Sequence, residues 1–254
     1  MLKISHISKT FNPGTVNEKK AIEDLSLELK KGDFATIIGS NGAGKSTLFN
    51  AICGDFMTDT GAIELDGRDI TFLPQHARAR EIGRLYQDPM RGTAPGMTIE
   101  ENLVLAAGKG GWLSHTTRQE KERFREELKK LDIGLEERMS HPVGLLSGGQ
   151  RQALTLLMAT MNPPKLLLLD EHTAALDPKT AELIMELTDR IVKEKKLTTI
   201  MVTHNLRYAV EYGNRLIMMH QGEAIIDKAG DKKAELSIDD ILSRFNEISI
   251  ECGN

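Results

Sequence analysis

The chain alternates apolar and polar residues in two stretches of its first third. Residues 25–29 place leucine at every second position, and the segment 62–65 leads directly into the turn-forming pair Asp66-Gly67. A period of two is typical of half-buried strands, and Asp-Gly favours a two-residue hairpin turn. We therefore predict an antiparallel sheet region near the N-terminus.

Unbroken apolar runs followed by helix-forming residues make up a second pattern. The first run, 34–38, ends at Gly39, and helix formers follow from Lys45. Buried strands that alternate with helices indicate a parallel α/β core. The later part of the chain repeats this alternation, with strands at 166–169, 199–202 and 216–219 and helices at about 178–192 and from 206 onward.

The middle of the chain has a helical pattern. Thr98 and Glu101 form a capping box before a helix at 99–107, and helix formers resume at 117–131 after a glycine-rich break at 108–111. We therefore predict a helical subdomain at 88–161.

Two further segments complete this organisation. An apolar helix at about 150–161 is closed by Pro163 and Pro164, which end the helical subdomain. The predicted subdomain then interrupts an α/β core made of residues 1–87 and 162–230. Ser237 and Asp240 predict another capping box, in a helical tail of residues 231–254.

Composition narrows the classes of partner. The 254 residues carry a formal net charge of −4, which gives no overall basic field for nucleic acid or anionic lipid. The N-terminus has no signal-peptide pattern, and no run of about 18 apolar residues suggests a membrane span. We expect a protein of the cytosol that does not itself cross a bilayer, in which Cys53 and Cys252 are ordinary reduced thiols.

A glycine loop follows the first buried strand. Glycines let backbone N–H groups wrap a phosphate, while the lysine neutralises it and the hydroxyl of Ser46 reaches Mg²⁺. The alternative is a glycine turn followed by a surface lysine. The loop residues are Gly39, Ser40, Asn41, Gly42, Ala43, Gly44, Lys45 and Ser46.

Two carboxylates stand at the end of the apolar strand 166–169. The carboxyl ends of parallel strands face the ligand crevice in open α/β sheets. In a phosphoryl-transfer site Asp170 would hold Mg²⁺ and Glu171 would deprotonate the attacking water. An acidic cap of a following helix is the competing interpretation.

The pentapeptide Leu146-Ser-Gly-Gly-Gln150 opens an apolar helix and presents a hydroxyl, flexible amides and a positive helix end to an anion. A plain serine-glycine helix cap is the alternative. With this motif the chain resembles the ABC ATPase family, whose signature is this pentapeptide between the phosphate loop and the acidic strand. The resemblance covers residues up to about Asp227.

The resemblance implies further site residues, each weak by itself. Gln87 stands at the family's glutamine loop, which contacts Mg²⁺ and water, and His204 resembles the switch histidine at the terminal phosphate. Phe11 resembles the aromatic residue that stacks on adenine, with core packing as its alternative. Asp177 resembles the loop that bridges two subunits, and it would also cap the helix that begins near Pro178.

The resemblance also implies an arrangement and a mechanism. It implies a P-loop NTPase core with an N-terminal antiparallel β subdomain and an inserted helical subdomain, which uses ATP and Mg²⁺. Two copies would pack head to tail, so that each ATP lies between Gly39 to Thr47 of one copy and Asp177 and the signature residues of the other. The signature residues that act in trans are Ser147, Gly148, Gly149 and Gln150.

Expected partners follow from the same resemblance. Because no membrane span is fused to the chain, the ATPase would dock on separate permease subunits at the cytoplasmic face of the membrane, with an extracytoplasmic substrate-binding protein and no nucleic acid. His172 stands where the family usually has proline, and the run Asp170 to Asp177 looks like ATPases of tryptophan or tyrosine uptake systems.

Three rival functions are less well supported. A DNA-acting ABC ATPase would carry long coiled-coil arms, yet the segment between Gln87 and Ser147 has no sustained heptads. A ribosome-binding ABC factor normally has two cassettes, whereas this chain has one phosphate loop and one signature. A kinase would share the phosphate loop but would not need the signature.

Overall fold

A computed structural model of the protein describes residues 1–108 and 116–251. The chain forms two compact units: unit 1 contains residues 1–81 and 198–254, and unit 2 contains residues 82–197. The predicted glycine-rich break at 108–111 falls largely outside the described residues, and so does Cys252. Cys53 is buried. The predicted subdomain boundaries stay a prediction.

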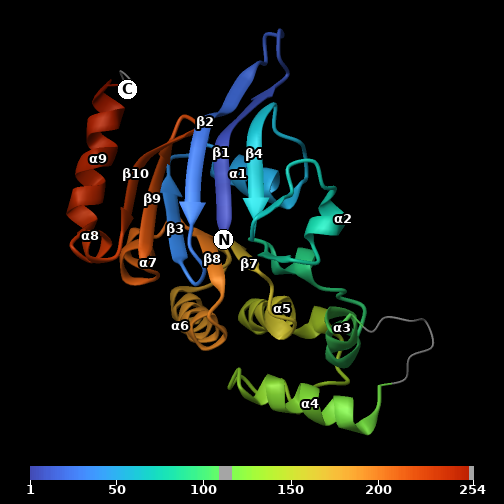
Figure 1. Cartoon of the computed structure of the whole chain (residues 1–254). Coiled ribbons are helices and arrows are strands. Elements are labelled where there is room, and N and C mark those ends of the chain that lie inside the picture. Colours follow the sequence, from blue (N-terminus) through green and yellow to red (C-terminus); the bar gives the residue numbers. More distant parts are fainter. Residues whose placement is uncertain (109–115, 252–254) are drawn as a thin grey trace. The chain divides into compact units, whose positions relative to one another are not determined.

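Unit 1 begins with an antiparallel sheet of order β2-β1-β4-β5. Figure 1 shows β2, β1 and β4 side by side, with β1 in the middle. Asp66 and Gly67 have φ angles of 55° and 78° and join β4 to β5, as a primed hairpin turn requires. The predicted antiparallel region is therefore confirmed. Its strands are β1 (Leu2–Phe11), β2 (Lys19–Leu29), β4 (Thr60–Leu65) and β5 (Arg68–Asp69).

A second set of strands in unit 1 has the order β10-β9-β3-β8. Strand β3 is buried throughout and pairs in parallel with both β8 and β9, while β10 pairs antiparallel with β9. These strands confirm the predicted parallel core, although β10 was not predicted. Their bounds are β3 (Phe34–Gly39), β8 (Thr198–Val202), β9 (Arg215–His220) and β10 (Glu223–Ala229).

The helices of unit 1 include the C-terminal tail. Ile241 in α9 packs with Ile38 and Met218 in one buried apolar cluster. Ser237 and Asp240 form the predicted capping box, because Asp240 N–H donates to Ser237 Oγ at 3.1 Å and Ser237 N–H donates to Asp240 Oδ2 at 2.9 Å. The tail therefore belongs to the packed core of unit 1. The helices are α1 (Lys45–Cys53), α2 (Gln75–Arg78), α7 (Leu206–Glu211), α8 (Asp231–Ala234) and α9 (Ile238–Glu251).

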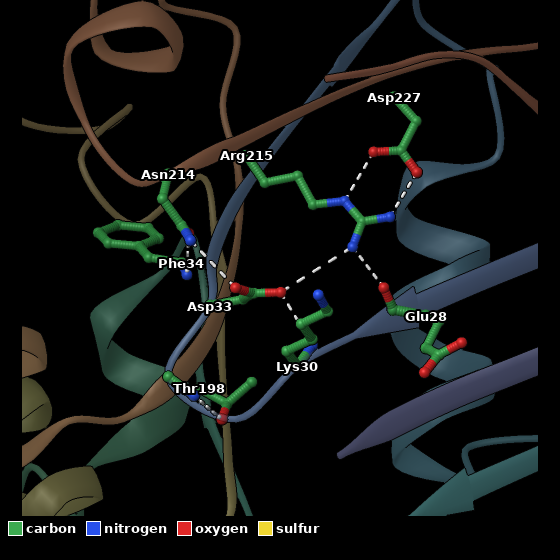
Figure 2. Close-up of polar contacts among 9 residues, drawn as sticks. Glu28, Lys30, Asp33, Phe34, Thr198, Asn214, Arg215 and Asp227 are labelled. Carbon is green, nitrogen blue, oxygen red and sulfur yellow. Dashed lines mark hydrogen bonds and ion pairs between the residues drawn. The ribbon is translucent and has the colours of Figure 1, made fainter. Parts of the chain in front are cut away.

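A polar network holds the amino end of β3 in place (Figure 2). Arg215 binds the carboxylate of Asp227 through two nitrogens and donates to the backbone oxygen of Glu28. Asn214 accepts from Phe34 N–H at 2.8 Å and donates to Asp33 at 3.0 Å. The network joins β2, β3, β9 and β10 at the amino end of β3, opposite the end at which Gly39 lies.

Unit 2 contains a parallel pair of strands and four longer helices. Strands β6 (Ile82–Leu85) and β7 (Leu166–Asp170) pair in parallel, with Leu85 opposite Leu169. The helices are α3 (Ile99–Ala106), α4 (Arg118–Lys129), α5 (Gly148–Met161) and α6 (Pro178–Lys195), with short 3-10 turns at Pro89–Gly92 and Val143–Leu145.

Capping boxes begin two helices of unit 2, one of them predicted at Thr98 and one found only in the structure at Thr117. Thr98 caps α3 through a complete capping box, and Thr117 does the same for α4. Helix α4 ends at Lys129, two residues before its predicted end. Among the described residues, none of the helices has both the length and the apolar character that a bilayer crossing requires.

Candidate active site

The phosphate loop of unit 1 connects the end of β3 to the start of α1. Gly39 has φ 155°, and a Cβ added there would lie 2.3 Å from the backbone oxygen of Met219. Gly44 has φ 100°, and its added Cβ would lie 2.6 Å from the backbone oxygen of Ala21. Both positions require glycine, because any side chain would collide with the backbone of a neighbouring strand.

Hydrogen bonds close this loop on itself and on the β9–β10 turn. Ala43 N–H donates to Ser40 O at 3.2 Å, and Gly222 N–H donates to Ala43 O at 3.1 Å. Glu23 N–H then donates to Gly222 O at 3.3 Å, which links the turn to β2. The loop backbone is thus held in place before any ligand arrives.

Lys45 lies inside the loop and is only 6% exposed, which excludes the surface-lysine alternative. Its Nζ donates to Gly39 O at 2.7 Å and to Ser40 O at 3.0 Å. Helix α1 has no side-chain cap and no acidic residue in its first turn, so its amino end presents backbone N–H groups and a positive dipole. Glycine loop, ammonium and helix end together form a cradle that suits a phosphate.

The other loop residues are placed around this cradle. Ser40, Asn41, Gly42 and Ser46 are exposed, Thr47 is half-buried, and Ala43 is buried. The hydroxyl of Ser46 is one residue beyond Lys45 at the start of α1.

Phe11 is the last residue of β1 and is half-buried. Its ring packs edge-to-face on Phe56, with centroids 5.3 Å apart and planes at 85°, and Lys9 Nζ lies 5.8 Å from its centroid. Its partial exposure is compatible with adenine stacking as well as with packing on Phe56. The stacking role therefore stays a prediction.

His204 follows β8 and is exposed. The residues on both sides of it are held by hydrogen bonds: Thr203 N–H donates to Ile37 O at 3.1 Å, and Asn205 caps α7. Since β8 and β3 are adjacent parallel strands, His204 and the phosphate loop leave the sheet at the same edge. The structure therefore brings these two predicted features of unit 1 together.

In unit 2 the acidic pair stands at the end of β7. Leu166 to Leu169 are fully buried, and Asp170 accepts a hydrogen bond from Arg84 Nη2 at 3.1 Å. Glu171 has φ 47°, which is rare for a residue with a side chain and costs about 1–3 kcal/mol. Gln87 is exposed two residues after Leu85, the register partner of Leu169, so Gln87 and Glu171 both follow the carboxyl end of the β6–β7 pair.

The donor types in these places suit magnesium. Ser46, Gln87 and Asp170 offer oxygen atoms, which are the ligands that Mg²⁺ prefers. No cluster of three or more His, Cys, Asp or Glu residues capable of holding a metal is present in the described part of the chain. Asp170 is the single carboxylate among these donors. Mg²⁺ is commonly bound by one or two carboxylates together with phosphate oxygens and water, so one carboxylate is enough for a metal bound with ATP.

The residue after Glu171 is buried, although it is a histidine. His172 is 2% exposed, and burial lowers the pKa of its imidazole to about 4, so it is neutral at pH 7. Thr188 Oγ1 donates to Ile184 O at 2.7 Å and so accepts from His172 Nε2 at 3.1 Å. His172 thereby ties the turn after Glu171 to α6.

The signature pentapeptide forms the amino end of α5. Ser147 and Gln150 make a capping box, with Gln150 N–H to Ser147 Oγ at 3.3 Å and Ser147 N–H to Gln150 Oε1 at 3.2 Å. A Cβ added at Gly149 would lie 2.2 Å from Thr180 Cγ2, and one at Gly148 would lie 3.2 Å from Leu176 Cδ2. Ser147 therefore caps α5, and the glycines allow α5 to approach α6 closely, while the nucleotide-binding role of the signature stays a prediction.

Asp177 caps α6, as the sequence predicted. Its Oδ1 accepts from Thr180 N–H at 3.1 Å, and hydrogen bonds from the Thr180 side chain and backbone lower the pKa of its carboxyl. Asp177 is exposed, and Thr180 is the residue that Gly149 approaches. The bridging role of Asp177 stays a prediction.

Sequence reasoning missed Arg84, which binds Asp170 in the structure. Arg84 also lies over the ring of Tyr86, with Cζ 4.7 Å from the centroid, next to Gln87. The sequence around Arg84 does not reveal that Asp170 is its partner, because the pairing of β6 with β7 determines which residues lie near each other.

Known proteins share this sequence and fold. A family model described as ABC transporter matches residues 22–174. The Tyrosine transport ATP-binding protein of Clostridioides difficile (strain R20291) is 46% identical over 248 residues, which cover 96% of this chain and 98% of that protein.

Solved structures agree with the fold. The cassette MJ0796, a dimer in a post-hydrolysis state bound to ADP and Pi, has a TM-score of 0.75 at 30% identity and covers 90% of this chain and 98% of its own. The cassette MJ1267 in its ADP conformation has a TM-score of 0.80 at 27% identity and covers 100% and 99%. The predicted fold class is confirmed, and the chain belongs to the ABC transporter family as one of its ATP-hydrolysing subunits.

Proposed function

We propose that the chain powers uptake of a small solute, an amino acid such as tyrosine or tryptophan, through separate membrane permease subunits. The observation that carries ATP use is the phosphate loop, where two glycines crowded by backbone surround a buried lysine ammonium. The amino-acid class is supported by 46% identity to a protein named for tyrosine transport.

Nucleotide binding in this proposal uses unit 1. Phe11 stacks on adenine, and the N–H groups of the phosphate loop and of the first turn of α1 bind the phosphates. Lys45 neutralises the terminal phosphates from inside the loop. The loop comprises Gly39, Ser40, Asn41, Gly42, Ala43, Gly44, Lys45, Ser46 and Thr47.

Mg²⁺ bound with ATP would neutralise phosphate charge and orient the terminal phosphate. Ser46, Gln87 and Asp170 would hold it through oxygen atoms. Arg84, which binds the Asp170 carboxylate at 3.1 Å, keeps that side chain at a fixed orientation.

Hydrolysis in this proposal depends on Glu171 as general base. Its carboxylate accepts the proton of the attacking water, and Gln87 helps to position that water. His204 contacts the terminal phosphate. The left-handed backbone conformation of Glu171 and the hydrogen bond of buried His172 fix the backbone position from which the Glu171 side chain extends.

Two copies complete each other's sites in this proposal. Ser147, Gly148, Gly149 and Gln150 present the amino end of α5, and Asp177 accompanies them, to the nucleotide held by the second copy. The dimeric form of the similar cassette MJ0796 supports this arrangement. ATP then joins the two copies, and hydrolysis lets them separate.

The remaining partners follow from the uptake role. The ATPase would lie on the cytoplasmic face of the membrane, bound to permease subunits, and an extracytoplasmic substrate-binding protein would deliver the solute. The net charge of −4 provides no general attraction for nucleic acid.

Calorimetry with Lys45→Ala tests the nucleotide site. The variant should lose tight ATP binding, because it removes the charge that compensates the phosphates. Lys31→Ala, an exposed lysine outside the loop, is the matched control and should bind like the wild type. Unchanged ATP affinity in Lys45→Ala would refute the site assignment.

Uptake of radiolabelled tyrosine and tryptophan tests the cargo. Cells that lack the chain should lose uptake of at least one of these amino acids, and the wild-type chain but not Lys45→Ala should restore it. Full uptake of both in the absence of the chain would refute the proposed cargo.

A further inference from the structure

Lys19 stands directly opposite the predicted adenine-binding residue. It is the first residue of β2, and it is the register partner of Phe11 at the end of β1. Opposite residues in an antiparallel pair project to the same face, with Cβ atoms about 4.5–5.5 Å apart. Phe11 and Lys19 therefore leave the sheet on one face.

The ammonium group of Lys19 extends to the phosphate loop. Its Nζ lies 3.8 Å from the position that a Cβ at Gly42 would occupy, and Gly42 has φ 85°. This is ordinary contact distance from the loop. Lys19 thus extends from the side of Phe11 to the loop that contains Lys45.

Lys19 has no anionic partner among the described residues. In the part of the chain that the structure describes, Lys19 forms no ion pair and no side-chain hydrogen bond, and it is exposed. Glu18, next to it, accepts from Gly14 N–H at 2.6 Å instead. By contrast, Lys20 forms an ion pair with Glu23 at 3.5 Å.

The connection between β1 and β2 is ordered by its own hydrogen bonds. Thr15 N–H donates to Asn12 O at 3.3 Å, and Glu18 N–H donates to Thr15 O at 3.0 Å. These contacts set the start of β2 and so the register that places Lys19 opposite Phe11. The backbone position from which the Lys19 side chain extends is therefore fixed.

We propose that Lys19 is a second cationic residue for the phosphates of the bound nucleotide, acting beside Lys45. The proposal rests on the proposed role of the phosphate loop. An ammonium on a flexible four-carbon stem is a point charge with three donors, which suits a phosphate that lies on the open side of the loop. A contact that is equally strong in bound ATP and in the transition state changes the affinity for ATP more than the rate of the hydrolytic step.

Binding measurements on Lys19→Ala, Lys19→Arg and Lys20→Ala test the proposal. Calorimetry would use a non-hydrolysable ATP analogue, ADP and adenosine. Lys19→Ala should weaken binding of the analogue and of ADP by roughly 10- to 150-fold, the range for one hydrogen bond to a charged group. Its affinity for adenosine should stay within about twofold of the wild type, because adenosine has no phosphate.

The matched variants separate charge from fold. Lys19→Arg keeps the charge and should retain most of the affinity, and Lys20→Ala should bind all three compounds like the wild type. The thermal midpoint of ligand-free Lys19→Ala should equal that of the wild type, because the side chain makes no internal contact of the kinds described above.

Three results would overturn the proposal. In the first, Lys19→Ala binds the ATP analogue with wild-type affinity while Lys45→Ala does not bind it tightly. That result would refute the role of Lys19 and leave the assignment of the phosphate loop standing. Another is an equal loss of affinity for adenosine and for the analogue, which would point to a change in the fold. The third is an equal loss in Lys20→Ala. If Lys45→Ala also binds normally, the phosphate-loop assignment itself fails.

Discussion

His172 donates through Nε2 to the hydroxyl oxygen of Thr188, 3.1 Å away, one residue after the candidate base Glu171. In a position where the ABC ATPases usually have proline, this chain uses a buried neutral imidazole to hold the turn against α6. A proline fixes φ covalently, whereas the imidazole acts through a hydrogen bond and packing. Acid should therefore affect this turn.

The first prediction concerns pH. Burial lowers the pKa of folded His172 to about 4 from 6.5, so between these values the unfolded chain takes up a proton that the folded chain does not. This contribution to stability is present above pH 6.5 and is lost as pH falls toward 4. From pH 7 to pH 4.5 the wild type should lose about 2 kcal/mol through this group.

Urea unfolding of the wild type and of His172→Gln at both pH values measures that loss. Glutamine does not titrate, and its amide can still reach Thr188, so the variant should lose about 2 kcal/mol less than the wild type between pH 7 and pH 4.5. The carboxylates of the rest of the chain are common to both proteins and cancel in the difference. Identical pH dependence would contradict the burial of a neutral imidazole.

The second prediction concerns the close approach of α5 to α6. Gly149→Ala should destabilise the protein by about 1–3 kcal/mol, because its Cβ would lie 2.2 Å from Thr180 Cγ2. Thr180→Ser removes that methyl group but keeps the hydroxyl, so adding it to Gly149→Ala should restore much of the loss. Denaturant unfolding checks this.

Gly96→Ala is the control for this pair, because a Cβ at Gly96 would meet nothing within 4 Å. It should change the free energy of unfolding far less than Gly149→Ala. If Thr180→Ser restores nothing in the double variant, the methyl contact is not the cause of the glycine requirement.

Local patterns predicted much of this fold because they depend on neighbours in sequence. Asp66-Gly67 specifies its turn through backbone preferences, and the buried run 166–169 specifies its strand through hydrophobicity. Strand β10 escaped prediction because it is an edge strand with exposed residues at 223, 225 and 227, and pairing with β9 holds it. The periodicity that marks a buried face is weak there.

Site residues were predictable where the chemistry lies within one motif. The glycines of the phosphate loop carry their signal in their spacing, and the structure adds the backbone oxygens that exclude side chains. Arg84 and Lys19 could not be assigned a role from sequence, because their contacts depend on strand register. Buried His172 also needed the structure, since Thr188 is 16 residues away.

The third prediction concerns action in trans. A mixed dimer of Lys45→Ala and Ser147→Arg subunits has one composite site with both lesions and one with neither. Equimolar mixing of the two inactive proteins, with subunit exchange verified, should therefore restore part of the ATPase rate. If mixing restores no activity, the intact composite site predicted by the trans arrangement is not formed or does not work alone.

The most direct test of the account is the oligomeric state and ATPase rate of Glu171→Gln. Glutamine keeps the size of the side chain but cannot accept the proton, so hydrolysis should fall by roughly 10²- to 10⁴-fold while ATP still binds. Light scattering behind a sizing column should show a dimer with Mg-ATP and a monomer without nucleotide or with ADP. A Glu171→Gln protein that hydrolyses ATP at the wild-type rate would contradict the central claim that Glu171 is the base.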